Sequence, residues 1–190
     1  MNIPLSDIIK SIPGTIGIRL ETDLPYKVIK TIDKIEIRQY QPFTLARVKS
    51  IGEFDQTQDE NFKHLANFIF GNNKTGKRTH MTTPVFHDQT EEGWIMSFYL
   101  PWEFSALKPQ DDNIWIEEMS AKTVAVYRYS GNNDQEKMQE SREHLISTVL
   151  SLGLDPESEV WWAQYDQPFA LPFVKRNEAM VRVSYTSTEL

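Results

Sequence analysis

Two stretches, EFDQTQDENFKHLANFIFG at residues 53–71 and DQEKMQESREHLISTVLSLG at residues 134–153, decide the fold that this sequence predicts. In both, mostly apolar residues recur at intervals of three and four, the spacing of one helix face. They are Phe62, Leu65, Ala66 and Ile69 in the first stretch, and Met138, Arg142, Leu145, Val149 and Leu152 in the second. A glycine closes each stretch, as is common after the last turn of a helix. We therefore expect one helix over 53–70 and another over 134–152.

Segments rich in β-branched and aromatic residues surround each predicted helix. They span 26–32, 34–40, 43–50, 79–87 and 94–100 around the first helix, and 113–118, 123–129, 160–165 and 179–186 around the second. This order predicts an α+β fold made of two βαββ-type repeats, at about 26–101 and 112–187. We expect two antiparallel sheets that curve toward a distorted β-barrel, with one main helix packed on each sheet and a cleft between the halves. The expected organisation is an N-terminal extension over 1–25 followed by a single domain over 26–190.

Composition excludes several classes of protein. The chain has 190 residues, no cysteine and a formal net charge of -7. Without cysteine it can form no disulfide, thiolate metal site or Cys-ligated haem, and its negative charge argues against a nucleic-acid partner. Residues 1–10 lack the basic start and apolar run of a signal peptide, and no segment approaches the roughly 20 apolar residues of a membrane span. We therefore expect a soluble, cytoplasmic protein without a membrane span.

No stretch of the sequence carries a convincing catalytic motif. Residues 71–78, GNNKTGKR, match a phosphate-binding loop as far as Lys77, but Arg78 follows where that loop needs a hydroxyl. A helix is also expected before this stretch and a strand after it, which is the reverse of a phosphate-binding loop. The chain contains no Gly-x-Ser-x-Gly elbow and no Gly-x-Gly-x-x-Gly fingerprint. We predict that the protein is not an enzyme.

Of the four histidines, His80 has the strongest case for a ligand role. It precedes Met81 on a predicted strand whose residues alternate in polarity, so its ring could point into a cleft. The alternative is an ordinary strand histidine bonded to a neighbour. His64 and His144 lie off the apolar stripes of their helices, where solvated surface positions are expected.

Phe169 and Phe173 lie in a loop that also contains Pro168 and Pro172. Exposed aromatic residues in such loops more often serve binding than packing. We therefore expect Phe173 at a ligand-binding surface.

Six groups of residues follow one another in a characteristic order: Tyr26–Ile29 with Glu36–Tyr40, Phe62–Asn73, His80–Val85, Ser97–Pro101, Thr123–Val126 with Ser130-Gly131, and Tyr165-Asp166 with Lys175–Glu178. Together they resemble the SOUL haem-binding protein family, over about residues 26 to 183. The resemblance implies a distorted β-barrel of two βαββ-type repeats, which agrees with the order of elements above. It also implies that haem or a related tetrapyrrole binds in a shallow apolar cleft beside the first helix, for sequestration or transfer and without catalysis.

The resemblance also suggests how a haem would be held. In some members an axial histidine occupies the position of Gln39, and glutamine is no strong iron ligand, so His80 is the candidate metal ligand here. Propionates would pair with Lys63, Lys175 or Arg176, although the first helix is otherwise acidic. The predicted ligand-binding residues are Gln39, Lys63, His80, Met81, Phe173, Lys175, Arg176 and Glu178.

Two other functions stay open at this point. Similar duplicated domains resemble the effector-binding modules of some regulators, which hold organic cations beside a buried glutamate. Glu178 would then be the recognition residue for a flat or cationic small molecule, or it belongs to a structural turn into the last strand. A protein-interaction role through a groove is the third possibility, and its partner is unknown.

Overall fold

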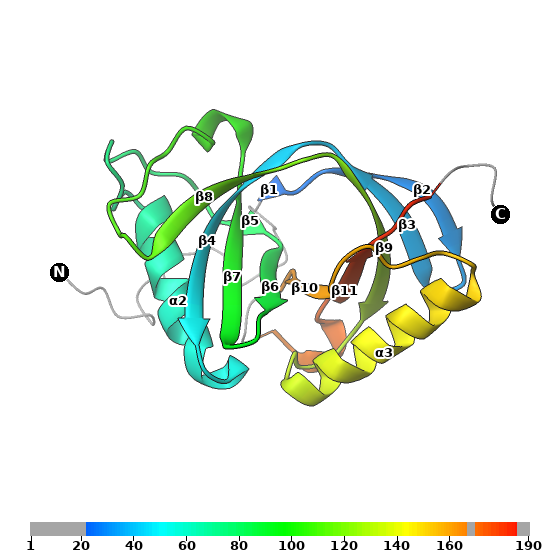
Figure 1. The fold of residues 1–190 in the computed structure, drawn as a ribbon. Coiled ribbons are helices and arrows are strands. Elements are labelled where there is room, and N and C mark those ends of the chain that lie inside the picture. Colours follow the sequence, from blue (N-terminus) through cyan, green and yellow to red (C-terminus); the bar gives the residue numbers. More distant parts are fainter. Residues whose placement is uncertain (1–21, 167–169, 186–190) are drawn as a thin grey trace.

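The computed structural model describes residues 22–166 and 170–185, and within them nine antiparallel strands form one sheet (Figure 1). The strand order is β2-β3-β9-β11-β10-β6-β7-β4-β8. The strands are β2 (Tyr26–Ile32), β3 (Ile35–Tyr40), β4 (Phe43–Ile51), β6 (Val85–Gln89), β7 (Gly93–Leu100), β8 (Ile114–Met119), β9 (Lys122–Tyr129), β10 (Trp161–Gln164) and β11 (Asn177–Arg182). Two short strands, β1 (Thr22–Asp23) and β5 (Thr82–Thr83), form a separate parallel pair. With its two long helices the fold is α+β, as predicted.

The helices are α2 (Phe54–Ile69) and α3 (Gln135–Ser151), each within one residue of its predicted bounds. Asp134 caps α3, because its side chain accepts a hydrogen bond from the backbone N–H of Lys137. Short 3-10 helices follow at η1 (Trp102–Phe104) and η2 (Pro172–Val174). Among the helices of the described residues, none combines the length and apolar composition that a membrane crossing requires.

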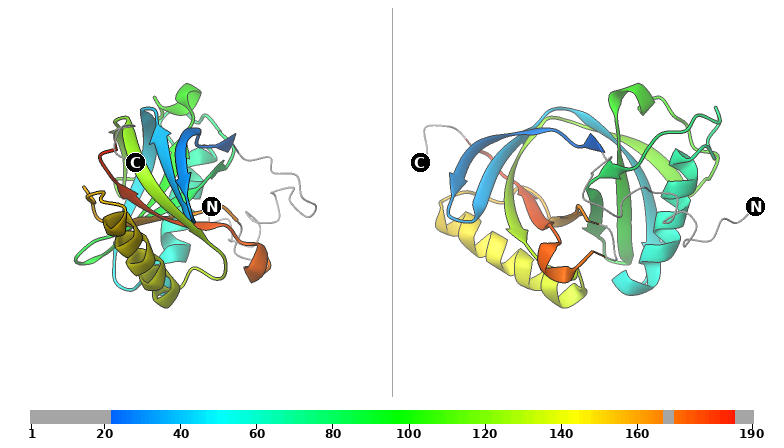
Figure 2. Two further views of the ribbon diagram at one scale, coloured as in Figure 1. Left: turned by 90° about the vertical axis from the view of Figure 1, so that its right-hand side faces the viewer. Right: turned by 180° about the vertical axis from the view of Figure 1, so that it is seen from behind.

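Both helices cover the same face of the sheet. Helix α2 packs on β4 and β7, whereas α3 packs on β9 and β11. The two helices converge at their N-terminal ends, where Gln135 Nε2 donates a hydrogen bond to Glu53 Oε2 at 2.8 Å. Figures 1 and 2 show the strongly curved sheet with both helices along its outer side.

Alternation along the strands divides the core between the two faces of the sheet. On the helix-covered face, Ala46 and Val48 pack with residues of α2, and Ile35 and Ile37 belong to the cluster that includes residues of α3. The opposite face, which we call the inner face, carries a third cluster that includes Leu45, Phe86, Val124, Val126, Ala163 and Met180. Both faces are therefore buried over much of their area, and polar residues on the inner face can be enclosed.

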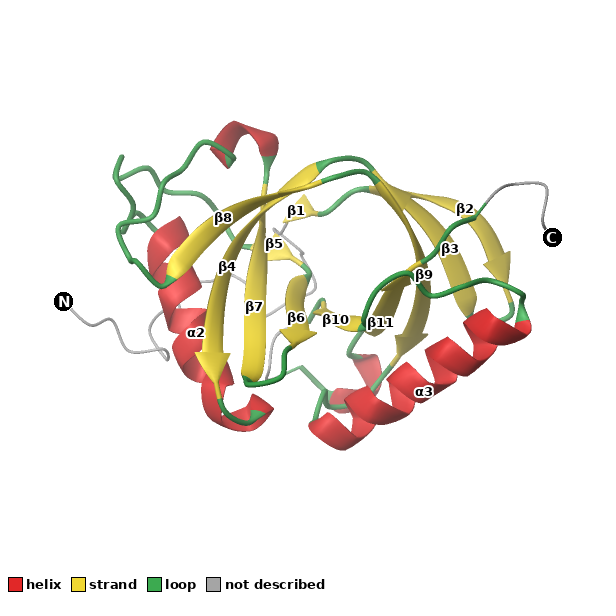
Figure 3. Cartoon of the chain, in the orientation of Figure 1, coloured by secondary structure: helices red, strands yellow, loops and turns green. Residues whose placement is uncertain are grey.

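The same order of elements occurs twice along the chain: β3, β4, α2, β6, β7 and then β8, β9, α3, β10, β11 (Figure 3). The first strand of each half pairs with the second strand of the other half: β3 pairs with β9, and β8 pairs with β4. In the centre, β6 pairs with β10. These pairings join the halves into one continuous sheet, so the prediction of two sheets was wrong. That the halves arose as repeats within one domain stays a prediction.

The sheet does not close into a barrel within the described residues. Its edge strands are β2 and β8, and no pairing joins them there. The predicted strand over 79–87 begins only at Thr82, continues to Gln89 and is interrupted at Pro84, which has no N–H to donate and separates β5 from β6. The last predicted strand ends at Arg182, earlier than expected, whereas Thr186, Pro168 and Phe169 lie outside the described residues.

Candidate functional site

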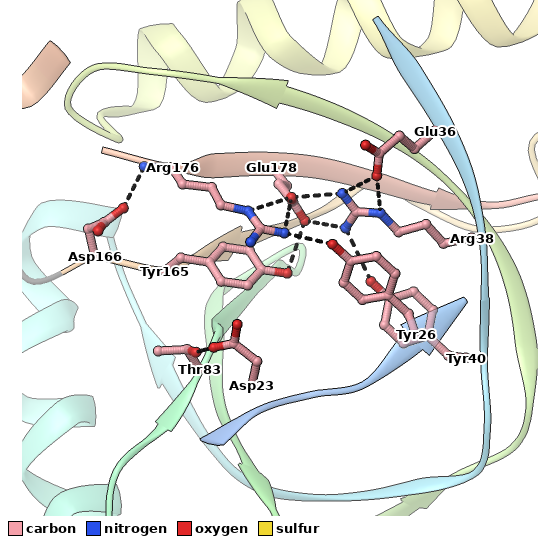
Figure 4. A network of polar contacts seen from close by, with 10 residues as sticks. All are labelled: Asp23, Tyr26, Glu36, Arg38, Tyr40, Thr83, Tyr165, Asp166, Arg176 and Glu178. Carbon is pink, nitrogen blue, oxygen red and sulfur yellow. Dashed lines mark hydrogen bonds and ion pairs between the residues drawn. The ribbon is translucent and has the colours of Figure 1, made fainter. Parts of the chain in front are cut away.

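A buried polar cluster on the inner face centres on Glu178, the second residue of β11 (Figure 4). Its side chain has 0% exposure, and that of Arg38 on β3 has 2%. Two parallel hydrogen bonds join them, from Arg38 Nη1 to Glu178 Oε2 at 2.6 Å and from Arg38 Nη2 to Glu178 Oε1 at 2.9 Å. A second guanidinium approaches from Arg176, whose Nε donates to Glu178 Oε1 at 2.9 Å. One carboxylate therefore serves two arginines.

Tyrosines complete the surroundings of this cluster. Tyr165 donates its hydroxyl hydrogen to Glu178 Oε2 at 3.0 Å, and its ring lies under the Arg176 guanidinium at 3.7 Å. Arg176 Nη2 in turn donates to the Tyr26 hydroxyl at 3.0 Å, while the Arg38 guanidinium lies 4.1 Å from the centre of the Tyr26 ring. The planar guanidinium groups thus combine hydrogen bonds with stacking on aromatic faces.

The charges in the cluster keep Glu178 ionised. Burial alone would raise the pKa of Glu178, but hydrogen bonds and charge from Arg38 and Arg176 hold that pKa below its usual value. Burial raises the pKa of Tyr165, and the adjacent Glu178 carboxylate raises it further. Glu36, which is half-exposed, accepts a further bond from Arg38 Nε at 2.7 Å, so the second arginine charge is also compensated.

Because both carboxylate oxygens of Glu178 are already bonded, the cluster is a closed internal structure in this conformation. An organic cation could reach Glu178 only by displacing one of the chain's own guanidinium groups, Arg38 or Arg176. The recognition role of Glu178 stays a prediction, and it requires that a ligand displace one of these two arginines. The structure brings Arg176 and Glu178 together as members of one cluster.

Sequence reasoning missed Arg38 and the tyrosines of this cluster. On β3, Glu36, Arg38 and Tyr40 alternate with Ile35 and Ile37, a pattern that is typical of a strand with one polar and one apolar face. Both faces are in fact buried, because the inner face carries a hydrophobic cluster of its own that includes Tyr40 and Val124. A signal was present: Arg38 lies in an otherwise β-rich segment, where a charged residue facing the core must be paired.

A second, more exposed group of predicted residues lies at the C-terminal end of α2. The backbone N–H of Thr79 donates to the carbonyl of Ile69 at 2.8 Å, which fixes the segment leading to His80 beside that helix end. His80 is exposed, and its ring meets the Phe104 ring edge-on with centroids 6.3 Å apart. Met81 is half-buried and packs on the hydrophobic cluster under α2. The imidazole is therefore accessible beside an apolar surface.

Two basic residues flank this group, one in the middle of α2 and one beside η1. Lys63 lies on the exposed side of α2. Lys77, which the sequence suggested only as part of a rejected phosphate loop, places its Nζ 4.6 Å from the centre of the Phe104 ring. Since Phe104 also contacts His80, a cation, an aromatic ring and an imidazole are adjacent here. The sequence did not indicate that Lys77 lies near His80, because both meet at Phe104 of η1 only in the tertiary structure.

Phe173 and Lys175 lie at the other end of α2. The carbonyl of Pro172 in η2 accepts a hydrogen bond from Gly131, just before α3, and Lys175 Nζ donates to Asn132 Oδ1 at 3.1 Å. Phe173 is 74% exposed, as expected for a binding residue. The 16 residues of α2 separate the two ends by roughly 24 Å at 1.5 Å per residue. One small ligand therefore cannot easily contact both His80 and Phe173.

Gln39 is exposed on β3, which is a neighbour of neither β5 nor α2 in the fold. The two helical histidines also differ from expectation. His64 is half-buried, and its Nδ1 contacts the carboxylate of Asp111, so the prediction of a purely solvated residue was wrong. His144 is exposed as predicted, with its ring 4.3 Å from that of Tyr127.

Solved structures define the fold class first. The C-terminal domain of EcmrR matches with a TM-score of 0.62 at 10% identity, covering 85% of this chain and 99% of that chain. An uncharacterized conserved protein from Listeria innocua matches with a TM-score of 0.58 at 10% identity, covering 80% of this chain and 92% of that one. At such low identity these similarities establish the fold alone.

Sequence comparison then identifies the family. The model of the SOUL heme-binding protein family matches residues 21–182, and the chain belongs to this family. Human Heme-binding protein 2 is 28% identical over 148 residues, which are 72% of this chain and 72% of that protein. The resemblance drawn from the six ordered groups is thereby confirmed.

Proposed function

We propose that the protein binds haem or a related tetrapyrrole in a shallow apolar cleft beside α2, for sequestration or transfer and without catalysis. Membership of a haem-binding family over residues 21–182 is the observation that carries this proposal. A bound haem would supply an iron that accepts an imidazole nitrogen, a flat apolar macrocycle and two propionate carboxylates. The residues at the C-terminal end of α2 match these three requirements.

His80 is the proposed iron ligand. Its ring is exposed, so a macrocycle can approach without unfolding the segment that carries it. Met81 and Phe104 provide apolar contacts next to it. Lys63, together with Lys77, would pair with a propionate through a charge-assisted hydrogen bond.

The predicted residues at the other end of α2 form a separate alternative. Phe173, with its exposed neighbours Leu171 and Val174, offers an apolar surface for a macrocycle. Lys175 lies next to this surface. Among the described residues, no histidine lies in η2 or in the segment around Gly131 and Asn132 that is hydrogen-bonded to it. Binding there would rest on apolar contact without an imidazole ligand, and Gln39 would take no part at either end.

A hemin titration with matched variants tests the proposal. We expect saturable one-to-one binding with a shifted Soret band and quenching of tryptophan fluorescence. His80→Ala should abolish the Soret shift, whereas Phe173→Ser and the exposed control His144→Ala should leave it intact. Loss of binding in Phe173→Ser alone would move the site to η2, and the absence of saturable binding would overturn the proposal.

A further inference from the structure

A pocket of about 280 Å³ opens on the inner face, away from α2 and from the Glu178 cluster. It lies where β4 and β9 begin and where β8 ends. Its walls include Phe43, Leu45, Phe86, Met119, Lys122 and Trp161. An adjoining pocket of about 390 Å³ shares Phe43, Met119 and Ser120 with it, so a longer molecule could extend from one into the other.

Lys122, the first residue of β9, is the half-buried cation of this pocket. Its Nζ lies 5.1 Å from the centre of the Phe43 ring and 4.9 Å from that of the Trp161 ring. Within the described part of the chain, this ammonium has no hydrogen-bond acceptor and no carboxylate oxygen within ion-pair distance. Burial lowers the pKa of Lys122 to about 8, so the group is still largely protonated at pH 7.

The other charged groups at this pocket already have partners. Arg47 Nη2 donates to Asp88 at 2.8 Å and its Nη1 donates to Glu117 at 2.6 Å. Arg182 pairs with Glu157 at 3.3 Å, and Glu159 pairs with Arg142 at 3.7 Å. Lys122 is therefore the cation whose three N–H donors are available to a ligand.

We propose that this pocket is a second ligand site, which binds a small carboxylate with an apolar body and holds the carboxylate at Lys122. The two rings beside Nζ and the side chains of Leu45, Phe86 and Met119 suit an aliphatic or aromatic body. A carboxylate supplies the acceptors that the half-buried ammonium lacks, in a setting where charge-assisted hydrogen bonds are strong. The ligand belongs to the class of short fatty acids and arylalkyl carboxylates.

The local geometry favours an anion over a cation. Two carboxylates line the pocket: Asp88 is bonded to Arg47, and Glu159, whose side chain is 88% exposed, pairs with Arg142. The net charge of -7 opposes the approach of anions in general, so any affinity must come from contacts inside the pocket. Specific binding of a carboxylate is accordingly distinguishable from nonspecific attraction.

Octanoate is the first probe, with octanol and octylammonium as neutral and cationic controls of the same chain length. Calorimetry and tryptophan fluorescence, to which Trp161 in the pocket contributes, should show saturable one-to-one binding of octanoate and much weaker binding of both controls. Lys122→Met should weaken octanoate binding by roughly tenfold to a hundredfold, the range expected when a charged hydrogen-bond partner is removed. Lys122→Arg should retain most of it.

Lys49→Met is the matched control, because Lys49 lies on β4 and pairs with Glu92 outside the pocket. Octanoate should bind this variant as it binds the wild type. Equal affinity for wild type and Lys122→Met, a preference for octylammonium, or no saturable binding would each overturn the proposal. Thermal unfolding of each variant verifies that it is folded.

A second titration separates this site from the proposed haem site. Octanoate should bind hemin-saturated protein with unchanged affinity, because the walls of its pocket include none of the residues proposed to hold haem at the C-terminal end of α2. Competition between octanoate and hemin that disappears in Lys122→Met would overturn the claim of a separate site. The octanoate experiment on hemin-free protein stands even if hemin does not bind.

Discussion

Two charged clusters lie on the inner face of the same sheet, and they combine arginine and carboxylate in opposite ratios. In the Glu178 cluster, one carboxylate bonds to two guanidinium groups, those of Arg38 and Arg176. In the second, which we call the Arg47 cluster, one guanidinium bonds to two carboxylates, those of Asp88 and Glu117. The central group is buried in both, but the outer groups differ: the Arg47 carboxylates are 34% and 41% exposed.

This difference in solvent access gives similar contacts different consequences. A buried ion pair gains little net stability over an apolar equivalent, but the loss of one partner leaves the other charged and dehydrated. A half-exposed carboxylate can instead regain water when its partner is lost. Substitutions in the Glu178 cluster, which joins β3 to β11, should therefore destabilise the fold strongly. Substitutions of the outer carboxylates in the Arg47 cluster, which borders an accessible pocket, should destabilise it little.

Among single substitutions, the largest expected effect is that of Glu178→Gln. This substitution leaves two guanidinium groups with a neutral partner in a buried place, so the free energy of unfolding should fall by about 3–5 kcal/mol. Glu117→Gln, which removes the charge of a half-exposed outer carboxylate in the Arg47 cluster, should cost about 0–1 kcal/mol. Urea unfolding of both variants measures the difference, and equal losses would show that the distinction between the clusters is wrong.

Removal of one arginine from the Glu178 cluster should have an intermediate effect. In Arg38→Met, Glu178 keeps its bond to Arg176, so the expected loss is about 2–3 kcal/mol. The double variant of Arg38→Met and Arg176→Met should lose more than the sum of the single variants, because only the double variant leaves Glu178 without a cation. A double-mutant cycle by urea unfolding measures this coupling, and strict additivity would contradict the shared role of Glu178.

Acid unfolding should distinguish Glu178 from the histidine on the other face of the sheet. Arg38 and Arg176 hold the pKa of Glu178 below its ordinary value of 4.5, so its contribution is present above that pH. That contribution is lost as the pH falls through the lowered pKa of the folded state. The unfolding free energy, measured as a function of pH, should therefore lose a component below about pH 4.5 in the wild type that Glu178→Gln lacks.

His87 provides the control for that measurement. It is fully buried, and burial lowers its pKa from 6.5 to about 4. The unfolded chain therefore takes up a proton first, and stability is lost as the pH falls from about 6.5 to 4. His87→Gln should remove this earlier decline and keep the later one, and a single unchanged decline in both variants would contradict the assignment.

The smallest expected effect concerns Lys122 beside the Arg47 cluster. Burial lowers its pKa from 10.5 to about 8, so between these values the unfolded state binds the proton and the folded state does not. Stability should rise modestly with pH over that range in the wild type and rise less in Lys122→Met. A matched rise in both variants, measured by thermal unfolding from pH 7 to 10.5, would show that the amine is freely solvated.

Local patterns predicted the elements better than their assembly. The stripes of Leu65 with Ile69 and of Leu145 with Val149 located both helices, because a helix face repeats within one turn or two. The pairing of β3 with β9 and of β8 with β4 depends on contacts between residues about 80 positions apart, which no local pattern encodes. For the same reason the two expected sheets turned out to be one.

The candidate sites show a similar division. The ordered groups that include His80–Val85 were enough to predict the family, and the exposure of Phe173 followed from its proline-containing loop. Arg176 is a sequence neighbour of Glu178, but Arg38 as its second partner, and the aromatic partners of Lys77 and Lys122, could not be predicted, because they come from distant strands or turns. The local sequence around a charged residue on a strand does not indicate whether that face of the strand is exposed to water or packed against another part of the protein.

By itself, the sequence determined that this chain forms two amphipathic helices among β-strands, that it contains no thiol chemistry and that it belongs to the SOUL family. These properties depend on residue type, spacing and order, which are local or additive. Only the tertiary structure decided that Arg38 and Arg176 enclose Glu178 and that Lys122 stands between two aromatic rings in a pocket. Such pairings depend on the curvature and register of one nine-stranded sheet, because those set which side chains leave water and which groups they meet when they do.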